Sequence, residues 1–253
     1  MSGSQGMHSP VAQFEIKPLI ELSFGAYDLS FTNSSLFMAL AVGISAVFLI
    51  SAMRRAELVP GRMQGLAEIM YEFVAEMVRS NVGHEGRPYF PFIFTLFVFL
   101  LFGNMLGLIP YSYTFTSQIV VTFAMAAFVF VGVTLIALFK HGLHFFSFFV
   151  PAGAPKVLIP FLIVIEVISY FVRPVSLSVR LFANMLAGHT MLKVFAGLAV
   201  MISGAGGLAM VGSVLPFLAL IGLTGLEVLV AALQAYVFTI LTCMYLNDAL
   251  HLH

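Results

Sequence analysis

The most informative segment of the sequence is Arg173-Pro174-Val175-Ser176-Leu177-Ser178-Val179-Arg180-Leu181-Phe182-Ala183-Asn184-Met185-Leu186-Ala187-Gly188-His189. It lies inside a long apolar region, yet it carries two arginines, an asparagine and a histidine. Placing one arginine at the centre of a bilayer costs about 2.5–3.5 kcal/mol on insertion scales, and more in simulations. A residue that costs this much needs a partner or a function.

The composition around this stretch is that of a polytopic membrane protein. Of 253 residues, 61% are hydrophobic and only 9% are charged, whereas about 25% are charged in a typical soluble domain. The net charge is zero, so no basic patch invites nucleic acid. The one cysteine, Cys243, cannot form an internal disulfide, and we expect it to be buried as a small hydrophobic residue. Motifs for metal, phosphate or redox cofactors are missing, which argues against soluble-type catalysis.

Two apolar runs precede this stretch, and together they provide three spans near the ~20 residues that a single crossing needs. Residues 36–53 end at Arg54-Arg55, and residues 88–139 contain no charge at all. The second run is too long for one helix, and Pro110-Tyr111-Ser112-Tyr113-Thr114 divides it into spans over 90–109 and 119–139.

Two further apolar segments, 158–201 and 212–247, are separated by a break rich in glycine. Each is longer than a perpendicular crossing, so it must tilt steeply, lie partly in the membrane plane, or break. The sequence therefore predicts an all-α membrane protein with about five crossings. Its regions are an external arm (1–35), the first helices (36–157) and a long helix hairpin (158–253).

The regions between the crossings are more polar. Residues 61–87 read as an amphipathic interfacial helix, with Glu68, Glu72 and Glu76 beside an apolar line of Ile69, Phe73 and Met77. Residues 141–157 read as a re-entrant or interfacial connector.

Basic residues give the orientation. The positive-inside rule places the segments that carry them in the cytoplasm, so the amino terminus lies outside and the carboxyl terminus inside. These basic residues are Arg54, Arg55, Arg62, Arg79, Arg87, Lys140 and Lys156. Tyr111 and Tyr113 suit the opposite interface as aromatic anchors.

The hairpin holds the polar residues of the membrane interior. They are Glu166, Ser169, Arg173, Arg180, Asn184, His189 and Lys193 on the first segment and Glu227 and Gln234 on the second. Arg173 and Arg180 are seven residues apart, as are Glu227 and Gln234, so each pair shares a helix face to within about 20°. His189 follows Arg180 by nine residues, which places it about half a turn round the helix.

Structural roles are the alternative for most of these residues. Arg173 and Lys193 can extend their stems towards water, and Asn184 and Gln234 can bridge helices by hydrogen bonds. His189 can bond a backbone carbonyl, and burial favours the protonated form of a lone carboxyl. Arg180 is harder to explain in this way, because an arginine stays charged and the nearest acid on its own segment is four turns away.

Carboxyl and imidazole groups beside one fixed cation favour a proton path. Both groups exchange protons near neutral pH once their pKa values shift, whereas arginine does not. An arginine between two relay segments would block leakage and attract a mobile carboxylate. The chain itself supplies no such carboxylate, so this reading requires a partner.

The pattern R-P-V-S-L-x-x-R-L-F-x-N-x-x-A-G closely resembles the signature of the a subunit of F-type ATP synthases. Residues 233–239 and Tyr245-Leu246 look like the family's last helix, and residues 103–110 resemble an earlier span. The resemblance implies two tilted helices curving round a rotating ring of c subunits. It implies that Arg180 faces the ring carboxylates, with Gln234 opposite it and Asn184 one turn on.

His189 and Glu227 match the arrangement of mitochondrial and alphaproteobacterial members, whereas many bacterial members have the acid and the imidazole exchanged. The resemblance thus implies an acid–imidazole pair that bridges the helices. Combined with the orientation, it predicts an outer half-channel lined by Asn184, His189 and Glu227. Glu166, with Ser169 and Arg173 nearby, would line the cytoplasmic half-channel.

The resemblance implies a proton-channel subunit that is not catalytic by itself, with no cofactor or metal. Its expected partners are the c-ring, b-type subunits of the peripheral stalk, the lipid bilayer and protons. Protons are favoured over Na⁺ because no cluster of oxygen ligands is visible. We expect a bacterial plasma membrane, favoured by the start of the chain, with the mitochondrial inner membrane as the alternative.

Two other classes remain in view. A self-contained transporter would usually show inverted repeats, which the sequence does not show convincingly. A purely structural scaffold would leave Arg180, His189 and Glu227 unexplained. A stoichiometric ring of small two-helix partners would separate the channel subunit from both classes.

Overall fold

The computed structural model describes residues 16–21, 23–24, 27–28, 30–54, 57–109, 112–149, 158–204 and 212–251. Within these ranges five helices are long and apolar enough to cross a membrane. The predicted class, an all-α membrane protein with about five crossings, is confirmed.

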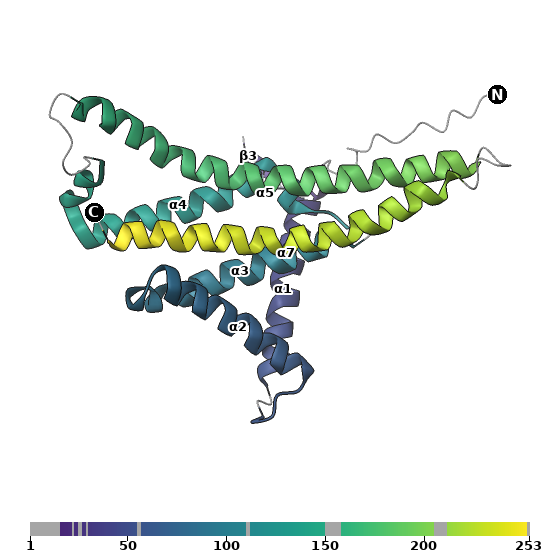
Figure 1. Ribbon diagram of the computed structural model, residues 1–253, viewed down its shortest axis with the longest axis horizontal. Coiled ribbons are helices and arrows are strands. Elements are labelled where there is room, and N and C mark those ends of the chain that lie inside the picture. Colours follow the sequence, from purple (N-terminus) through teal and green to yellow (C-terminus); the bar gives the residue numbers. More distant parts are fainter. Residues whose placement is uncertain are drawn as a thin grey trace.

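Three of these helices have the length of a single crossing (Figure 1): α1 (Asn33–Met53), α3 (Phe90–Gly107) and α4 (Ile119–His141). At 1.5 Å per residue they span about 27–35 Å, close to the ~30 Å of a bilayer core. The Thr32 side chain caps α1 by accepting a hydrogen bond from the Ser35 amide. A 3₁₀ turn that contains Pro88, η2 (His84–Tyr89), leads into α3.

The predicted hairpin consists of two much longer helices, α5 (Ile159–Gly204, 46 residues) and α7 (Val214–Leu250, 37 residues). Their lengths are about 69 and 55 Å, so each must run obliquely through a bilayer. In Figure 1 the two arms lie close together near the α5–α7 turn and diverge towards the carboxyl terminus. Pro174 lies inside α5, which continues through it, so the chain does not break there.

The amphipathic helix α2 (Arg62–Asn81) packs against α3 and α7. Of the predicted apolar line, Met77 is buried, whereas Ile69 and Phe73 are 64% and 45% exposed. Steps of four residues drift round a helix, whereas mixed steps of three and four stay on one face. The buried face follows the mixed steps through Ala67, Met70, Val74 and Met77.

The described part of the predicted arm contains two short antiparallel ladders. Strand β1 (Pro18–Ile20) pairs with β4 (Phe31–Thr32), and β2 (Ser23–Phe24) pairs with β3 (Tyr27–Asp28). Helix α1 then starts at Asn33, slightly before the predicted span.

The connection between α3 and α4 is packed rather than spread on a membrane interface. It contains a short 3₁₀ turn, η3 (Phe115–Ser117), in which all three residues are buried. Tyr113 is only 6% exposed and packs with Phe115 and Ala41. The prediction of an interfacial anchor is wrong for Tyr113, because its ring fills the space beside α1, and Tyr111 lies outside the described residues.

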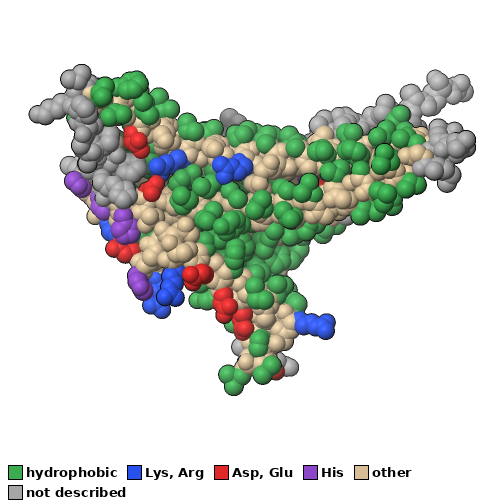
Figure 2. Space-filling view, in the orientation of Figure 1, with side chains coloured by type: hydrophobic (Ala, Val, Ile, Leu, Met, Phe, Trp, Pro, Cys, Tyr) green, Lys and Arg blue, Asp and Glu red, His purple; other side chains and the backbone are tan. Residues whose placement is uncertain are grey.

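Charged side chains gather at the edge of the molecule where α4 and α7 end and along α2, whereas the far halves of the two long helices are largely apolar on the visible face (Figure 2). At that edge Lys140 of α4 contacts Glu85 and donates a hydrogen bond to the Leu250 carbonyl at 3.2 Å. Beyond α4 the chain enters η4 (Gly142–Phe149), within the predicted connector. The asymmetry agrees with a cytoplasmic edge at the ends of α4 and α7.

Candidate functional site

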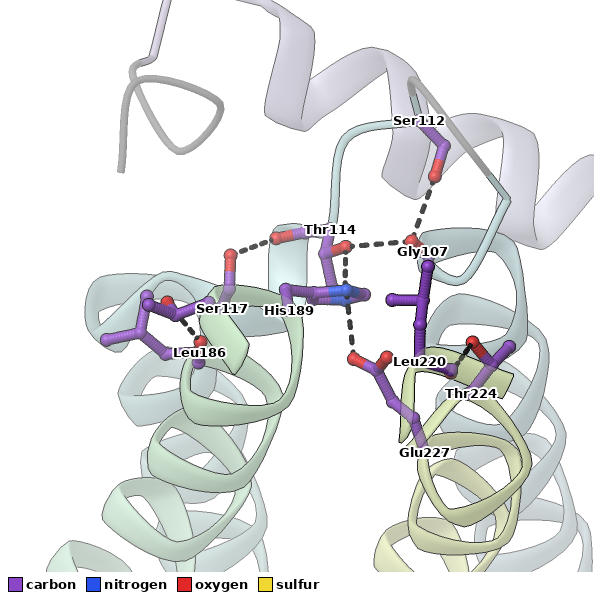
Figure 3. Close-up of polar contacts among 10 residues, drawn as sticks. Gly107, Ser112, Thr114, Ser117, Leu186, His189, Leu220, Thr224 and Glu227 are labelled. Atoms are coloured by element: carbon purple, nitrogen blue, oxygen red, sulfur yellow. Dashed lines mark hydrogen bonds and ion pairs between the residues drawn. The ribbon is translucent and has the colours of Figure 1, made fainter. Parts of the chain in front are cut away.

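Helices α5 and α7 bring His189 and Glu227 together (Figure 3). The imidazole Nδ1 lies 2.9 Å from the carboxyl Oε1, and the two side chains are only 10% and 5% exposed. A carboxylate buried in a low dielectric is stable only when it is paired or protonated. The pair is therefore either an imidazolium beside a carboxylate or a neutral imidazole beside a protonated carboxyl group.

The close approach of Glu227 to α5 depends on Gly188. A Cβ atom at this position would lie 2.8 Å from Glu227 Oε1 and 3.2 Å from its carboxyl carbon. The glycine lets the carboxyl group rest directly against the α5 backbone, one residue before His189. Gly188 was part of the signature stretch, but only the fold reveals why a side chain would not fit.

A third element, the α3–α4 connection, contributes Thr114. Its hydroxyl lies 2.9 Å from Nε2 of His189 and donates to the Gly107 carbonyl at 3.2 Å. Sequence reasoning used Thr114 only as part of a helix break, because no spacing rule relates a loop residue to a helix 75 positions later. The contact places the acid–imidazole pair beside this connection. The connection lies away from the charged edge, which the positive-inside rule assigns to the cytoplasm.

Next to the pair, Asn104 ties α3 to α7. Its amide donates to the Ala231 carbonyl at 3.1 Å, one turn beyond Glu227, and the side chain is fully buried. Gln234 is 6% exposed and lies two turns from Glu227 on the same buried face, as its spacing predicted.

Arg180 lies on the other face of α5. It is exposed, as is Asn184 one turn later, whereas His189 is buried, so the predicted separation of the two faces is confirmed. Within the described residues no carboxylate oxygen lies within 4.0 Å of its guanidinium. A cation exposed on an apolar helix is costly in a membrane unless it gains a partner or water.

Arg173 has a different environment, towards the other end of the hairpin. It forms an ion pair with Asp248 at 2.8 Å, and its guanidinium lies 5.6 Å and 5.2 Å from the ring centroids of Tyr170 and Tyr245. Asp248 was missed because it stands near the chain end, outside the predicted crossing. The pair and both tyrosines line a small pocket enclosed by α4, η4, α5 and α7.

The remaining predicted residues lie outside the His189–Glu227 and Arg173–Asp248 pairs. Glu166 is half-buried, and Ser169 and Lys193 are exposed. Glu166 and Arg173 are nearly two turns apart on α5, and no ion pair joins them in the described structure. The described residues also hold no group of three His, Cys, Asp or Glu side chains with the geometry of a metal site.

Taken together, the site places an imidazole beside a carboxyl group, two groups that can exchange a proton. An imidazole and a carboxyl at hydrogen-bond distance exchange a proton readily when their proton affinities are matched. The guanidinium on the opposite face holds its proton throughout.

Comparisons with known proteins agree with this picture. The family model described as ATP synthase A chain matches residues 35–247. The chain is similar to ATP synthase subunit a of Rhodospirillum rubrum, with 58% identity over 98% of this chain and 100% of the relative. It is 55% identical to ATP synthase subunit a of Parvibaculum lavamentivorans over 96% of this chain and 93% of the relative. It is 52% identical to ATP synthase subunit a of Agrobacterium fabrum over 96% of this chain and 98% of the relative.

Proposed function

The chain belongs to the ATP synthase A chain family, and from this premise we propose that it is the stator proton channel of an F-type ATP synthase. It is a multi-pass membrane subunit of the proton-translocating sector and does not itself catalyse nucleotide chemistry. Two offset half-channels carry protons to and from a rotating ring of carboxylates.

The observation that carries the proposal is the division of α5 into two faces. His189 and Glu227 form a buried proton-exchanging pair beside the outer α3–α4 connection. Arg180 faces away from that pair without a carboxylate partner in the described chain. A ring of carboxylates passing the exposed face of α5 would supply the counter-charge that Arg180 lacks.

In the outer half-channel, a proton reaches His189 and Glu227 and passes beyond Asn184 to a ring carboxylate. The neutralised carboxyl group can then rotate into lipid, where a charged one would be unstable. Gln234, on the face of α7 that carries Glu227, lies further along the path from the outside.

In the cytoplasmic half-channel, another ring carboxylate releases its proton. Glu166 and Ser169 line this path, and Arg173 lies beside it in its ion pair with Asp248. Arg180 separates the two half-channels because its fixed charge repels a proton moving directly between them. Each charge that crosses 100 mV releases about 2.3 kcal/mol, so several protons are needed for each ATP.

The partners of this function are the c-ring, b-type subunits of the peripheral stalk, protons and the lipid bilayer. The relatives reported above are bacterial, and we place the chain in a bacterial inner membrane.

Gly188→Ala tests the outer half-channel without removing any titratable group. The new methyl would meet the Glu227 carboxyl at 2.8 Å, so we expect the carboxyl to be displaced and ATP-driven acidification of membrane vesicles to fall about tenfold. The matched control is Gly197→Ala on the same helix, because no atom lies within 4 Å of its Cβ position. Normal pumping by Gly188→Ala in a normally assembled complex would contradict the proposed path.

A further inference from the structure

The hydroxyl of Thr114 lies between a backbone carbonyl and a nitrogen of the His189 ring. It lies 3.2 Å from the carbonyl oxygen of Gly107, at the end of α3, and 2.9 Å from Nε2 of His189. Thr114 is only 4% exposed, so water does not readily replace either contact. Gly107 makes the arrangement possible, because a Cβ atom there would lie 2.5 Å from the threonine oxygen.

When the threonine hydroxyl donates to Gly107, whose carbonyl oxygen also accepts from Ser112 Oγ at 3.0 Å, the position of the ring hydrogen is restricted. A threonine hydroxyl has one hydrogen to donate and an oxygen that accepts. The Gly107 carbonyl only accepts, so a hydrogen bond to it uses the threonine hydrogen. The threonine oxygen then faces Nε2 as an acceptor, and a favourable contact requires a hydrogen on Nε2.

We propose that Thr114 is a positioning residue that keeps a proton on Nε2 of His189 and leaves Nδ1 to exchange its proton with Glu227. This inference rests on the proposed function, since it assigns a role within the outer half-channel. The hydrogen-bond partner of one imidazole nitrogen decides what the other can do, and here the other nitrogen lies 2.9 Å from a carboxyl oxygen.

The exchange joins Nδ1 of His189 and Oε1 of Glu227, which are 2.9 Å apart. In one state the imidazolium carries hydrogens on both nitrogens and Glu227 is a carboxylate. When the Nδ1–H bond breaks and an O–H bond forms on Glu227, both groups become neutral and Nε2 keeps its hydrogen. The bond to Thr114 is the same in both states, so the hydrogen between Nδ1 and Glu227 is the only one that moves.

Without the hydroxyl, the neutral imidazole is free to hold its hydrogen on Nδ1. In that tautomer Nδ1 donates to Glu227 and is no longer able to receive a proton from it. We expect transfer through the pair to slow, although Glu227 and His189 are both present.

The test compares Thr114→Val, which keeps the shape but removes the hydroxyl, with Thr114→Ser, which keeps the hydroxyl. ATP-driven acidification by the assembled complex should fall about five- to tenfold in Thr114→Val and stay near the wild-type rate in Thr114→Ser. Thr116→Val is the matched control: Thr116 is fully buried in the same connection, and its hydroxyl oxygen has no hydrogen-bond partner in the described structure, so we expect normal pumping. A wild-type rate in Thr114→Val, or an equal loss in Thr114→Ser, would overturn the inference.

Parallel measurements separate this inference from the proposed function. If His189→Ala pumps normally, the proposed half-channel fails; if His189→Ala is inactive and Thr114→Val is normal, only the role of Thr114 fails. A readout that does not depend on pumping is nitrogen and carbon NMR of isotopically labelled histidine in the wild-type complex, with the His189 signal assigned by its loss in His189→Gln. We expect a hydrogen on Nε2, and a neutral ring with its hydrogen on Nδ1 would overturn the inference even where Thr114→Val does not assemble.

Discussion

Membranes that carry Arg180→Ala should contain the assembled complex at its normal level and yet show almost no ATP-driven acidification, with a loss of at least about 100-fold. Arg180 is exposed on α5 and takes no part in the buried contacts of the hairpin, so its removal should leave the packing intact. What disappears is the fixed positive charge that attracts an ionised ring carboxylate and keeps the two half-channels apart.

Lys193→Ala provides the control for Arg180→Ala, because Lys193 is a second exposed cation on the same helix. We expect it to pump at nearly the wild-type rate. Quantifying the complex by immunoblot separates loss of transport from loss of assembly. Persistent pumping by Arg180→Ala would make the arginine structural and would remove the separator from the mechanism.

Glu227→Gln should reduce ATP-driven acidification by about 100-fold, the lower end of what one positioned proton-transfer group contributes. Glutamine has nearly the same shape, so it can remain beside Gly188 and His189, but it cannot take up and release a proton. Because glutamine is neutral, the substitution leaves no uncompensated charge, and assembly should be normal.

Glu72→Gln on α2 is the matched control, since Glu72 is exposed and distant in sequence from the hairpin. It removes the same titratable group from a surface helix, and its pumping should be unchanged. If Glu227→Gln pumps as fast as Glu72→Gln, the buried carboxyl serves only to pack the helices.

The helices and the faces of the hairpin could be predicted from the sequence, because hydropathy and helical spacing act locally. The half-turn between Arg180 and His189 follows from nine residues of helix, and the structure shows one exposed and the other buried. The same reasoning placed Gln234 on the face of Glu227.

Contacts between distant segments could not be predicted in this way. Asp248 lies 75 residues from Arg173, and Thr114 lies 75 residues from His189, so their meeting depends on how α4, α5 and α7 pack. Tyr113 shows a related limit: its type and position suited a membrane interface, but packing against α1 buries it. The buried face of α2 depends on its packing against α3 and α7, which the spacing of residues within α2 does not reveal.

The most direct test of two offset half-channels is sided labelling of single cysteines on either side of Arg180. In a Cys243→Ala background, Asn184→Cys and Ser169→Cys would each be treated with a membrane-impermeant methanethiosulfonate in sealed vesicles of both orientations. Mass spectrometry would then measure the modified fraction. We predict that Asn184→Cys reacts only from the outer side and Ser169→Cys only from the cytoplasmic side. Reaction of both residues from the same side would contradict the division of the path at Arg180.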